Sequence, residues 1–180
     1  MAIAFTPTPS GILLPNHRIT INGVAMGLTK GGVEINVSTA WVNATADQYG
    51  SMRLNMFSAG DEVTVKFGLA EFSYANLNYA LGTTSTLRST GGTAVGVGGL
   101  YSGAKVGTTV AVALIFHRLT IDDGTISDDI NVWKAILTRC DPIKYSNDEP
   151  VTLMTEWSVI ADTSKTAGKM LIDFGLAAAT

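Results

Sequence analysis

Apolar and polar residues alternate along several segments of the chain, which is the pattern of strands with one buried face. The clearest case is residues 33–41, where a period of two places one set of side chains in a core and the other on a polar surface. A second alternating strand covers residues 63–69. Upstream, Ile19 and Ile21 lead into an Asn22-Gly23 turn, the strongest short signal for a hairpin.

The second half of the chain predicts further strands over residues 108–119, 130–138, 151–160 and 169–174. The first is apolar on both faces, as in a covered strand. In the second, strict alternation places Ala135 on the face opposite Val132. In the last, alternation predicts that Met170, Ile172 and Phe174 share the face that closes the sheet.

One segment has a helical period instead. In residues 70–81 the apolar positions form a helical stripe, and Gly82 follows where a glycine would end the helix. We expect Phe72, Leu77 and Leu81 to pack against the sheet. The whole pattern predicts a mainly β fold: an antiparallel β-sandwich or barrel with one flanking α-helix and a long hairpin arm, in a single domain over residues 1–180.

Three segments do not fit regular strands. Residues 1–16 contain several prolines and predict an irregular N-terminal arm. Residues 43–60 interleave polar and apolar side chains, which favours a long hairpin arm or loop. Residues 82–107 are rich in Gly, Ser and Thr and almost uncharged, so we expect an interaction loop that orders on assembly.

Composition adds a second clue. Charged residues make up 15% of the chain and apolar residues 46%, whereas about 25% charged residues is usual in soluble domains. Either the fold is unusually compact, or other subunits cover much of the surface; we favour the second interpretation. The net charge of −3 is not that of a protein that reads nucleic-acid grooves. We expect no signal peptide and no membrane span, because the longest apolar run is residues 110–116.

The sequence offers little chemistry. His17 and His117 lack the spacing of metal ligands, and the single cysteine, Cys140, is expected to be a buried, inert thiol. The glycines at 96–99 are not followed by the residues of a phosphate-binding loop, and the acidic residues at 122–129 lack calcium-loop spacing. We therefore expect no catalytic residues, no cofactor and no metal.

The three tryptophans allow a different interpretation. Trp41, Trp133 and Trp157 could form a platform for sugars, but each lies on an alternating strand face, where packing in a core or interface is favoured. The alternative function is thus a β-sandwich binding module, either a carbohydrate-binding or a capsid-decorating domain.

Two stretches resemble a known family. The first includes Thr-Ala-Asp-Gln-Tyr-Gly at 45–50 and the strand from Gly60 that runs into Leu-Ala-Glu at 69–71; the second includes Ile-Ala-Asp at 160–162 and the Gly-Lys pair at 168–169. Together they resemble the tail tube proteins of long-tailed bacteriophages. The resemblance covers less than half of the chain and does not include residues 1–16 or 82–107.

The resemblance implies both a fold and an assembly. Tail tube proteins are β-sandwiches or barrels flanked by a helix; six copies form a ring whose inner strands join into one barrel, and rings stack into a tube that conducts the genome. Implied partners are further copies of the chain, the tape measure, tail terminator and baseplate or tip proteins, and a sheath in contractile tails. DNA would pass through the lumen without specific binding. The implied location is the virion tail, with assembly in the host cytoplasm.

From these inferences we name candidate residues. Strands 33–41 and 63–69 are expected to pair across subunits, and the lumen is expected to be neutral or acidic. A solvated cross-strand pair of Glu34 and Lys66 on the outer surface is the alternative for the lumen set. The candidate lumen residues are Glu34, Asn36, Thr64 and Lys66, and the candidate interface residues are Asn43, Asp47, Gln48, Tyr49, Met52, Leu54, Met56 and Phe57.

Overall fold

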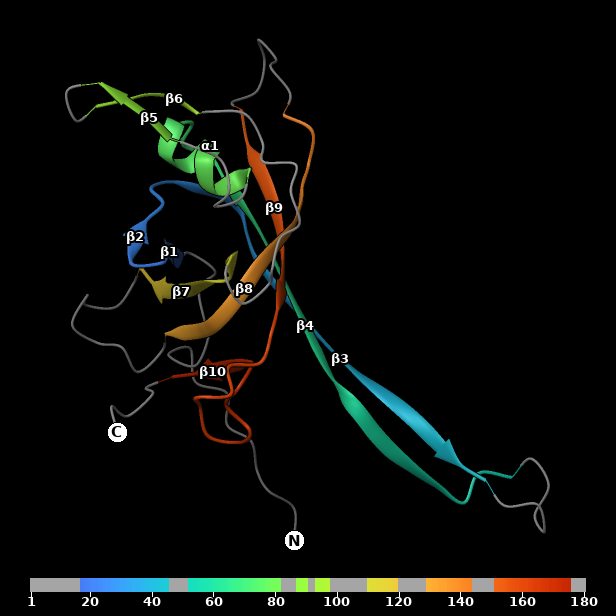
Figure 1. Ribbon diagram of the computed structural model, residues 1–180. Helices are drawn as coiled ribbons and strands as arrows, with labels where there is room; N and C mark the ends of the chain where they lie inside the picture. Colours follow the sequence, from blue (N-terminus) through green and yellow to red (C-terminus); the bar gives the residue numbers. More distant parts are fainter. Residues whose placement is uncertain are drawn as a thin grey trace, which may run out of the picture.

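The computed structural model describes residues 17–45, 52–81, 87–90, 93–97, 110–119, 129–143 and 151–175. Its elements are β1 (His17–Ile21), β2 (Val24–Ala25), β3 (Thr29–Ala44), β4 (Asn55–Leu69), α1 (Tyr74–Ala80), β5 (Leu87–Thr90), β6 (Thr93–Val97), β7 (Val112–Arg118), β8 (Ile130–Cys140), β9 (Leu153–Val159) and β10 (Ile172–Phe174) (Figure 1). The predicted mainly β, antiparallel fold with a flanking helix and a long hairpin is confirmed.

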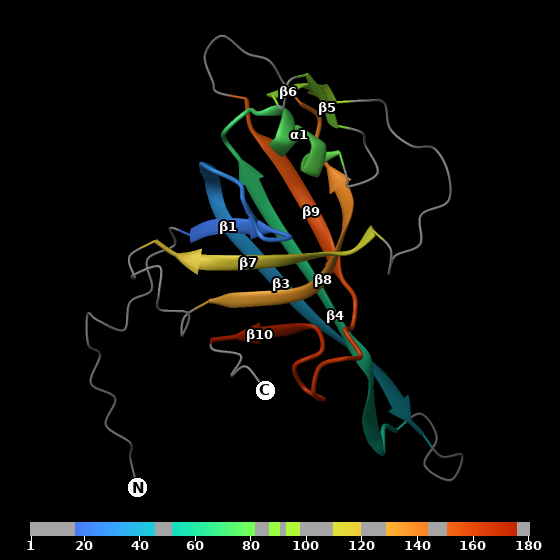
Figure 2. The ribbon, with the colours of Figure 1, turned by 60° about the vertical axis from the view of Figure 1, so that its left-hand side comes forward.

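A single antiparallel sheet carries the fold. Its strand order is β2-β1-β7-β8-β9-β4-β3, and β10 adds to β8. β7 and β10 pair with the first residues of β8, whereas β9 pairs with the last. Figure 2 shows β1, β7 and β10 running across the direction of β9, β4 and β3. The sheet is not closed. β8 bends, so that the two halves of the sheet face each other as in a sandwich.

A β-bulge marks this bend. Val112 lies opposite Ala135 and Leu114 opposite Val132, so that β8 has one more residue than β7 in this interval. Consequently Val132 and Ala135 both point into the core, where they are 1% and 0% exposed. The prediction that they lie on opposite faces is wrong, because the bulge interrupts the alternation.

Aromatic side chains join the two halves of the sheet. The Phe67 ring from β4 meets Phe116 from β7 edge to face at 5.9 Å and stacks on Trp157 from β9 at 6.0 Å. The buried Trp157 indole donates a hydrogen bond to Thr155 Oγ1 at 2.9 Å, and this hydroxyl donates to the Phe67 carbonyl at 3.2 Å. Thr155 thus satisfies the one polar group of the largest core residue.

Residues 26–28 link β2 to β3, and this linker connects the two ends of the sheet. Met26 N donates to Ile19 O, and Leu28 O accepts from Ala70 N at 2.8 Å. The buried Asn76 side chain of α1 donates to Met26 O at 3.0 Å and to Glu71 O at 2.7 Å. Since Met26 is buried, Asn76 supplies a partner that water does not offer its carbonyl.

The helix itself is shorter than predicted. It begins at Tyr74 after the N-cap Ser73, whose side chain accepts from Asn76 N at 3.1 Å, and it ends at Ala80. Leu77 packs partly buried against the core, as expected. Phe72 precedes the helix and is 42% exposed, so the prediction that it packs against the sheet is wrong. The Ser73 cap ends the extended segment before the helical stripe can include Phe72.

Two other predictions need correction. The loop predicted over residues 82–107 contains the β5–β6 hairpin, which pairs Leu87 with Val97; other parts of that loop, like residues 1–16, lie outside the described residues. Phe174 is 63% exposed, whereas Asp173 turns inward and accepts from Lys169 Nζ at 3.1 Å. Phe174 therefore does not close the core.

Gly27 provides a test of the linker. It has φ +71°, and a Cβ there would collide with the Glu71 carboxylate; Gly23 has φ +81° with open space around it. Gly23→Ala should lower the free energy of unfolding by about 1–2 kcal/mol through backbone strain alone. Gly27→Ala should lower it further, because Glu71 must also move. Chemical denaturation measures both, and equal losses would contradict a role for the Glu71 contact.

Candidate subunit interface

The end of the β3–β4 hairpin projects from the body of the molecule (Figure 1). Pairing continues from Thr39 and Asp61 out to Ala44 and Asn55. We call residues 40–45 and 52–60 the arm. It includes the predicted interface residues Asn43, Met52, Leu54, Met56 and Phe57, whereas Asp47, Gln48 and Tyr49 lie outside the described residues.

Both faces of the arm are apolar and uncovered. Val42 lies opposite Phe57 on one face, while Trp41 and Met56 lie on the other, opposite Ser58 and Asn43. Exposed fractions are 56% for Val42, 58% for Phe57 and 55% for Trp41. A two-stranded ribbon is marginally stable in water on its own, and exposed patches of this kind mark interaction sites.

The outer edge of β3 is a second unpaired surface. β3 is 16 residues long, and among the described strands it pairs with β4 alone. Residues 64–69 of β4 have no such edge, because β9 pairs along their other side. The prediction that strand 63–69 pairs across subunits is therefore wrong, and β3 remains the candidate. At the far side, the described part of β8 beyond residue 135 pairs only with β9.

The lumen candidates share one face of this sheet. Glu34 lies opposite Lys66, and Asn36 lies opposite Thr64. The row continues, since Lys66 lies opposite Glu156 with an Nζ–Oε1 distance of 3.9 Å, and Glu156 lies opposite Arg139. Charges of opposite sign thus alternate across the strands, and each exposed pair contributes under about 1 kcal/mol. The face is polar, and its charges compensate one another.

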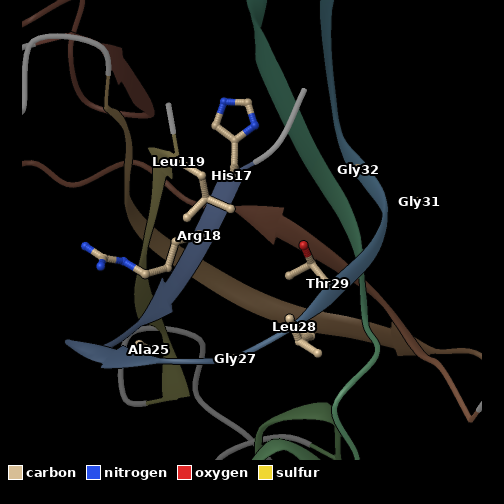
Figure 3. A pocket seen from close by; sticks show the side chains of 9 residues that line it. All are labelled: His17, Arg18, Ala25, Gly27, Leu28, Thr29, Gly31, Gly32 and Leu119. Carbon is tan, nitrogen blue, oxygen red and sulfur yellow. The ribbon is translucent and has the colours of Figure 1, made fainter. Parts of the chain in front are cut away.

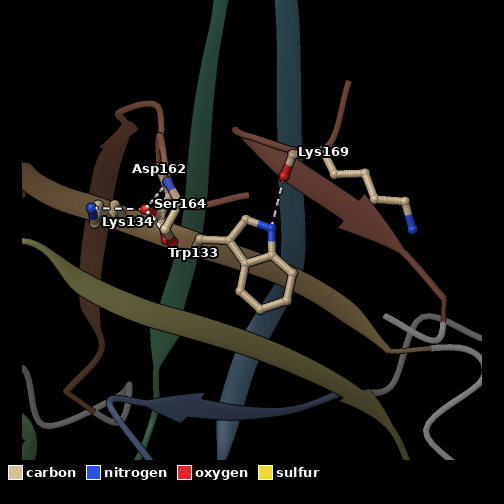
Figure 4. Close-up of polar contacts among 5 residues, drawn as sticks. All are labelled: Trp133, Lys134, Asp162, Ser164 and Lys169. Atoms are coloured by element: carbon tan, nitrogen blue, oxygen red, sulfur yellow. Dashed lines mark hydrogen bonds and ion pairs between the residues drawn. The ribbon is translucent and has the colours of Figure 1, made fainter. Parts of the chain in front are cut away.

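Side-chain contacts hold the turn after β9, residues 160–169, against β8 (Figure 4). Asp162 Oδ1 accepts from Lys134 Nζ at 2.9 Å, from Ser164 Oγ at 2.9 Å and from Ser164 N at 3.2 Å. The Lys134 hydrogen bond, followed by those of Ser164, lowers the pKa of Asp162 from 3.8 to about 2.

Trp133 holds the other side of the same turn. Its indole Nε1 donates to Lys169 O at 2.9 Å, and Lys165 Nζ lies 4.0 Å from its ring centroid. The Ile-Ala-Asp and Gly-Lys residues therefore have a structural role. Their partner Lys134 could not be predicted from the sequence, because it lies on another strand.

The candidate polar residues of the sequence lie in separate parts of the described structure. His117 Nδ1 lies 2.6 Å from Asp129 Oδ1, and both side chains are buried. Cys140 is partly buried and not buried as predicted; this burial, followed by the nearby Asp141 charge, raises the pKa of its thiol and disfavours the thiolate. Trp157 is 1% exposed, so the three tryptophans do not form one exposed platform. In the part of the chain that the structure describes, no three His, Cys, Asp or Glu side chains are grouped to hold a metal.

A cavity of about 420 Å³ lies beside β1 and the start of β3 (Figure 3). Its described lining includes His17, Arg18, Gly31 and Gly32, and none of these described residues carries a carboxylate. The side chains of His17 and Arg18 extend in different directions in Figure 3. They do not converge on one ligand position, so this cavity is not the candidate site.

Comparison with known proteins adds no identification: no family model matches the chain, and no curated protein sequence matches it significantly. Within the described residues, no helix combines the length and apolarity needed to cross a membrane. The arm and the free sheet edges are therefore the features on which a function must be argued.

Asp162 gives a pH-dependent prediction. Because its pKa falls from 3.8 to about 2 on folding, its stabilisation is complete above about pH 4 and is lost as the pH falls towards 2. Asp162→Asn should lower the thermal midpoint by a constant amount above pH 5, and the difference should shrink below pH 4. Asp141→Asn, which removes an exposed carboxylate, is the control. A difference that does not change with pH would contradict this assignment.

Proposed function

We propose that the protein is a self-assembling structural subunit of the tail tube of a long-tailed bacteriophage, in which stacked six-membered rings conduct DNA. The observation that carries this proposal is the arm with its two uncovered apolar faces. An isolated protein in water would expose these side chains at a cost of roughly 25 cal/mol per Å² of apolar surface. A neighbouring copy on each face would remove that cost.

The sheet edges support ring formation. The strands β3, β4, β9 and the end of β8 form a continuous antiparallel sheet with a free edge on each side among the described residues. Pairing β3 of one copy with β8 of the next would join such sheets head to tail, and head-to-tail contacts form a ring when the rotation between copies closes. The edges would then no longer be a risk for aggregation.

The polar face of the same sheet suits a DNA conduit. Its described charged residues include Lys30, Lys66 and Arg139 on one side of the balance and Glu34, Glu62, Glu156 and Asp141 on the other, with Asp141 Oδ1 3.0 Å from Arg139 Nε. With this face in the lumen, the duplex would meet compensated charges and hydroxyl groups. Each uncompensated cation would bind phosphate, and ring symmetry would multiply its effect.

The proposed partners follow from this role. Further copies of the chain are the main partner. The tape measure, terminator and baseplate or tip proteins contact the inside or the ends of the tube, and in a contractile tail a sheath surrounds it. DNA passes without specific binding. The proposed location is the virion tail, after assembly in the host cytoplasm.

Phe57→Ser tests the assembly. The purified protein should form rings or tubes in negative-stain microscopy and sediment accordingly, whereas Phe57→Ser should shift it to monomers because one apolar face of the arm is lost. Phe174→Ser is the matched control, since Phe174 is 63% exposed and Phe57 58%. A wild-type monomer at all concentrations would refute the proposed function, and glycan binding by that monomer would favour a binding module.

A second variant tests the lumen. Glu34→Lys combined with Glu156→Lys should still assemble, because both side chains lie on the polar face away from the core. The resulting tubes should retain DNA with an affinity that falls steeply as salt rises. Lys66→Glu should give tubes that do not retain DNA. Wild-type and variant tubes that retain DNA equally would place this face outside the lumen.

A further inference from the structure

A groove lies at the base of the arm. It has a volume of about 390 Å³ and lies between β3, β4 and the segment that leads into β10. Its lining is mainly apolar and includes Val37, Val63, Met170 and Ile172, with Asp61 as the one charged residue among the described lining residues. Val37 is 55% exposed although it belongs to the apolar face of β3. The groove is thus the open end of the core.

We propose that this groove receives the outer part of the arm, residues 52–54, from a second copy of the chain. The inference rests on the proposed function, since it names the contact by which one subunit holds the next. The inference adds a binding groove for the arm and a pair of opposite charges that orient the two copies.

The occupant must come from another copy. The arm is a paired ribbon from Trp41 and Ser58 out to Ala44 and Asn55. Since a strand advances about 3.3 Å per residue, the outer part of the arm is separated from the groove by several such steps along the ribbon. A paired ribbon cannot fold back on its own base without breaking its ladder. The groove at the base of the arm in one copy can therefore bind the apolar outer part of the arm of another copy, which gives a head-to-tail contact.

The side chains are complementary in shape and character. Met52 and Leu54 are 56% and 48% exposed at the outer part of the arm. Methionine and leucine are flexible enough to fill an irregular apolar groove, and methionine adapts well to such surfaces. Packing there would cover Val37 and the apolar lining of the groove.

The charges are also complementary. Arg53 is the one charged residue among the described residues of the arm, and Asp61 is the one charged residue of the described groove lining. Asp61 is exposed and accepts a hydrogen bond from Thr39 Oγ1 at 2.6 Å, which orients its carboxylate. An arginine can form two parallel hydrogen bonds with a carboxylate, so a pair between Arg53 and Asp61 would fix the orientation of the arm.

The test is a charge swap between molecules. Arg53→Glu and Asp61→Arg should each reduce the assembled fraction at least tenfold in sedimentation, because each places like charges in the contact. Mixed in equal amounts, the two variants should recover assembly. The acidic arm of the first variant then meets the basic groove of the second, and the unchanged arm of the second meets the unchanged groove of the first. A single chain that carries both substitutions should also recover assembly.

Controls make the outcomes decisive. Glu62→Arg changes the neighbouring carboxylate on the opposite face of β4 and should assemble normally. The thermal midpoint of each variant shows whether it is folded. The mixing experiment can be interpreted when both single variants are folded. Normal assembly of both single variants, or no recovery in the mixture, would overturn the proposal while wild-type tubes would leave the proposed function standing. Recovery in the double variant without recovery in the mixture would place the pair within one chain and would also overturn it.

Discussion

The contact of Phe67 with Phe116 holds the two halves of the sheet face to face, Trp157 stacks on Phe67 from the neighbouring strand, and the other features depend on this cluster. The contact requires β8 to bend at its bulge, so that one strand belongs to both halves. The core that results ends near Val63 on β4. Because β3 and β4 continue beyond it, their apolar side chains lack cover and form the arm.

The same core explains why the sheet stays open. Asn76 and the linker bring the β2 and β3 ends together, but β3 gains no strand partner beyond β4 among the described residues. A long edge and an apolar arm are liabilities for a soluble monomer. They are compatible with a chain of 15% charged residues if further copies cover them. The proposed tail tube role, the groove and the charge pair all follow from this incomplete cover.

Much of this organisation could be predicted from local patterns. The alternation of residues 33–41 predicted which side chains of β3 share a face, and the mixed polarity of residues 43–60 predicted the hairpin arm with its Met52, Leu54, Met56 and Phe57. The expected core position of that face is wrong beyond Ile35, since Val37 and Trp41 are each 55% exposed where β3 extends past the core. Phe72 and Phe174 were placed wrongly, because a cap and an inward-facing aspartate override the period locally. The role of Asp162 was not predictable, since its partner Lys134 lies on a different strand.

The order of apolar and polar residues alone determined the β class, the main strands and the position of the arm, because strand periodicity and turn residues act over a few neighbours. Only the tertiary structure decided which strand edges stay free, that β9 covers β4, and that Asp61 lies in a groove beside Met170. These features depend on which distant segments meet. Which distant segments come into contact is decided by strand pairing and by packing of the core, and no local sequence pattern encodes these long-range contacts.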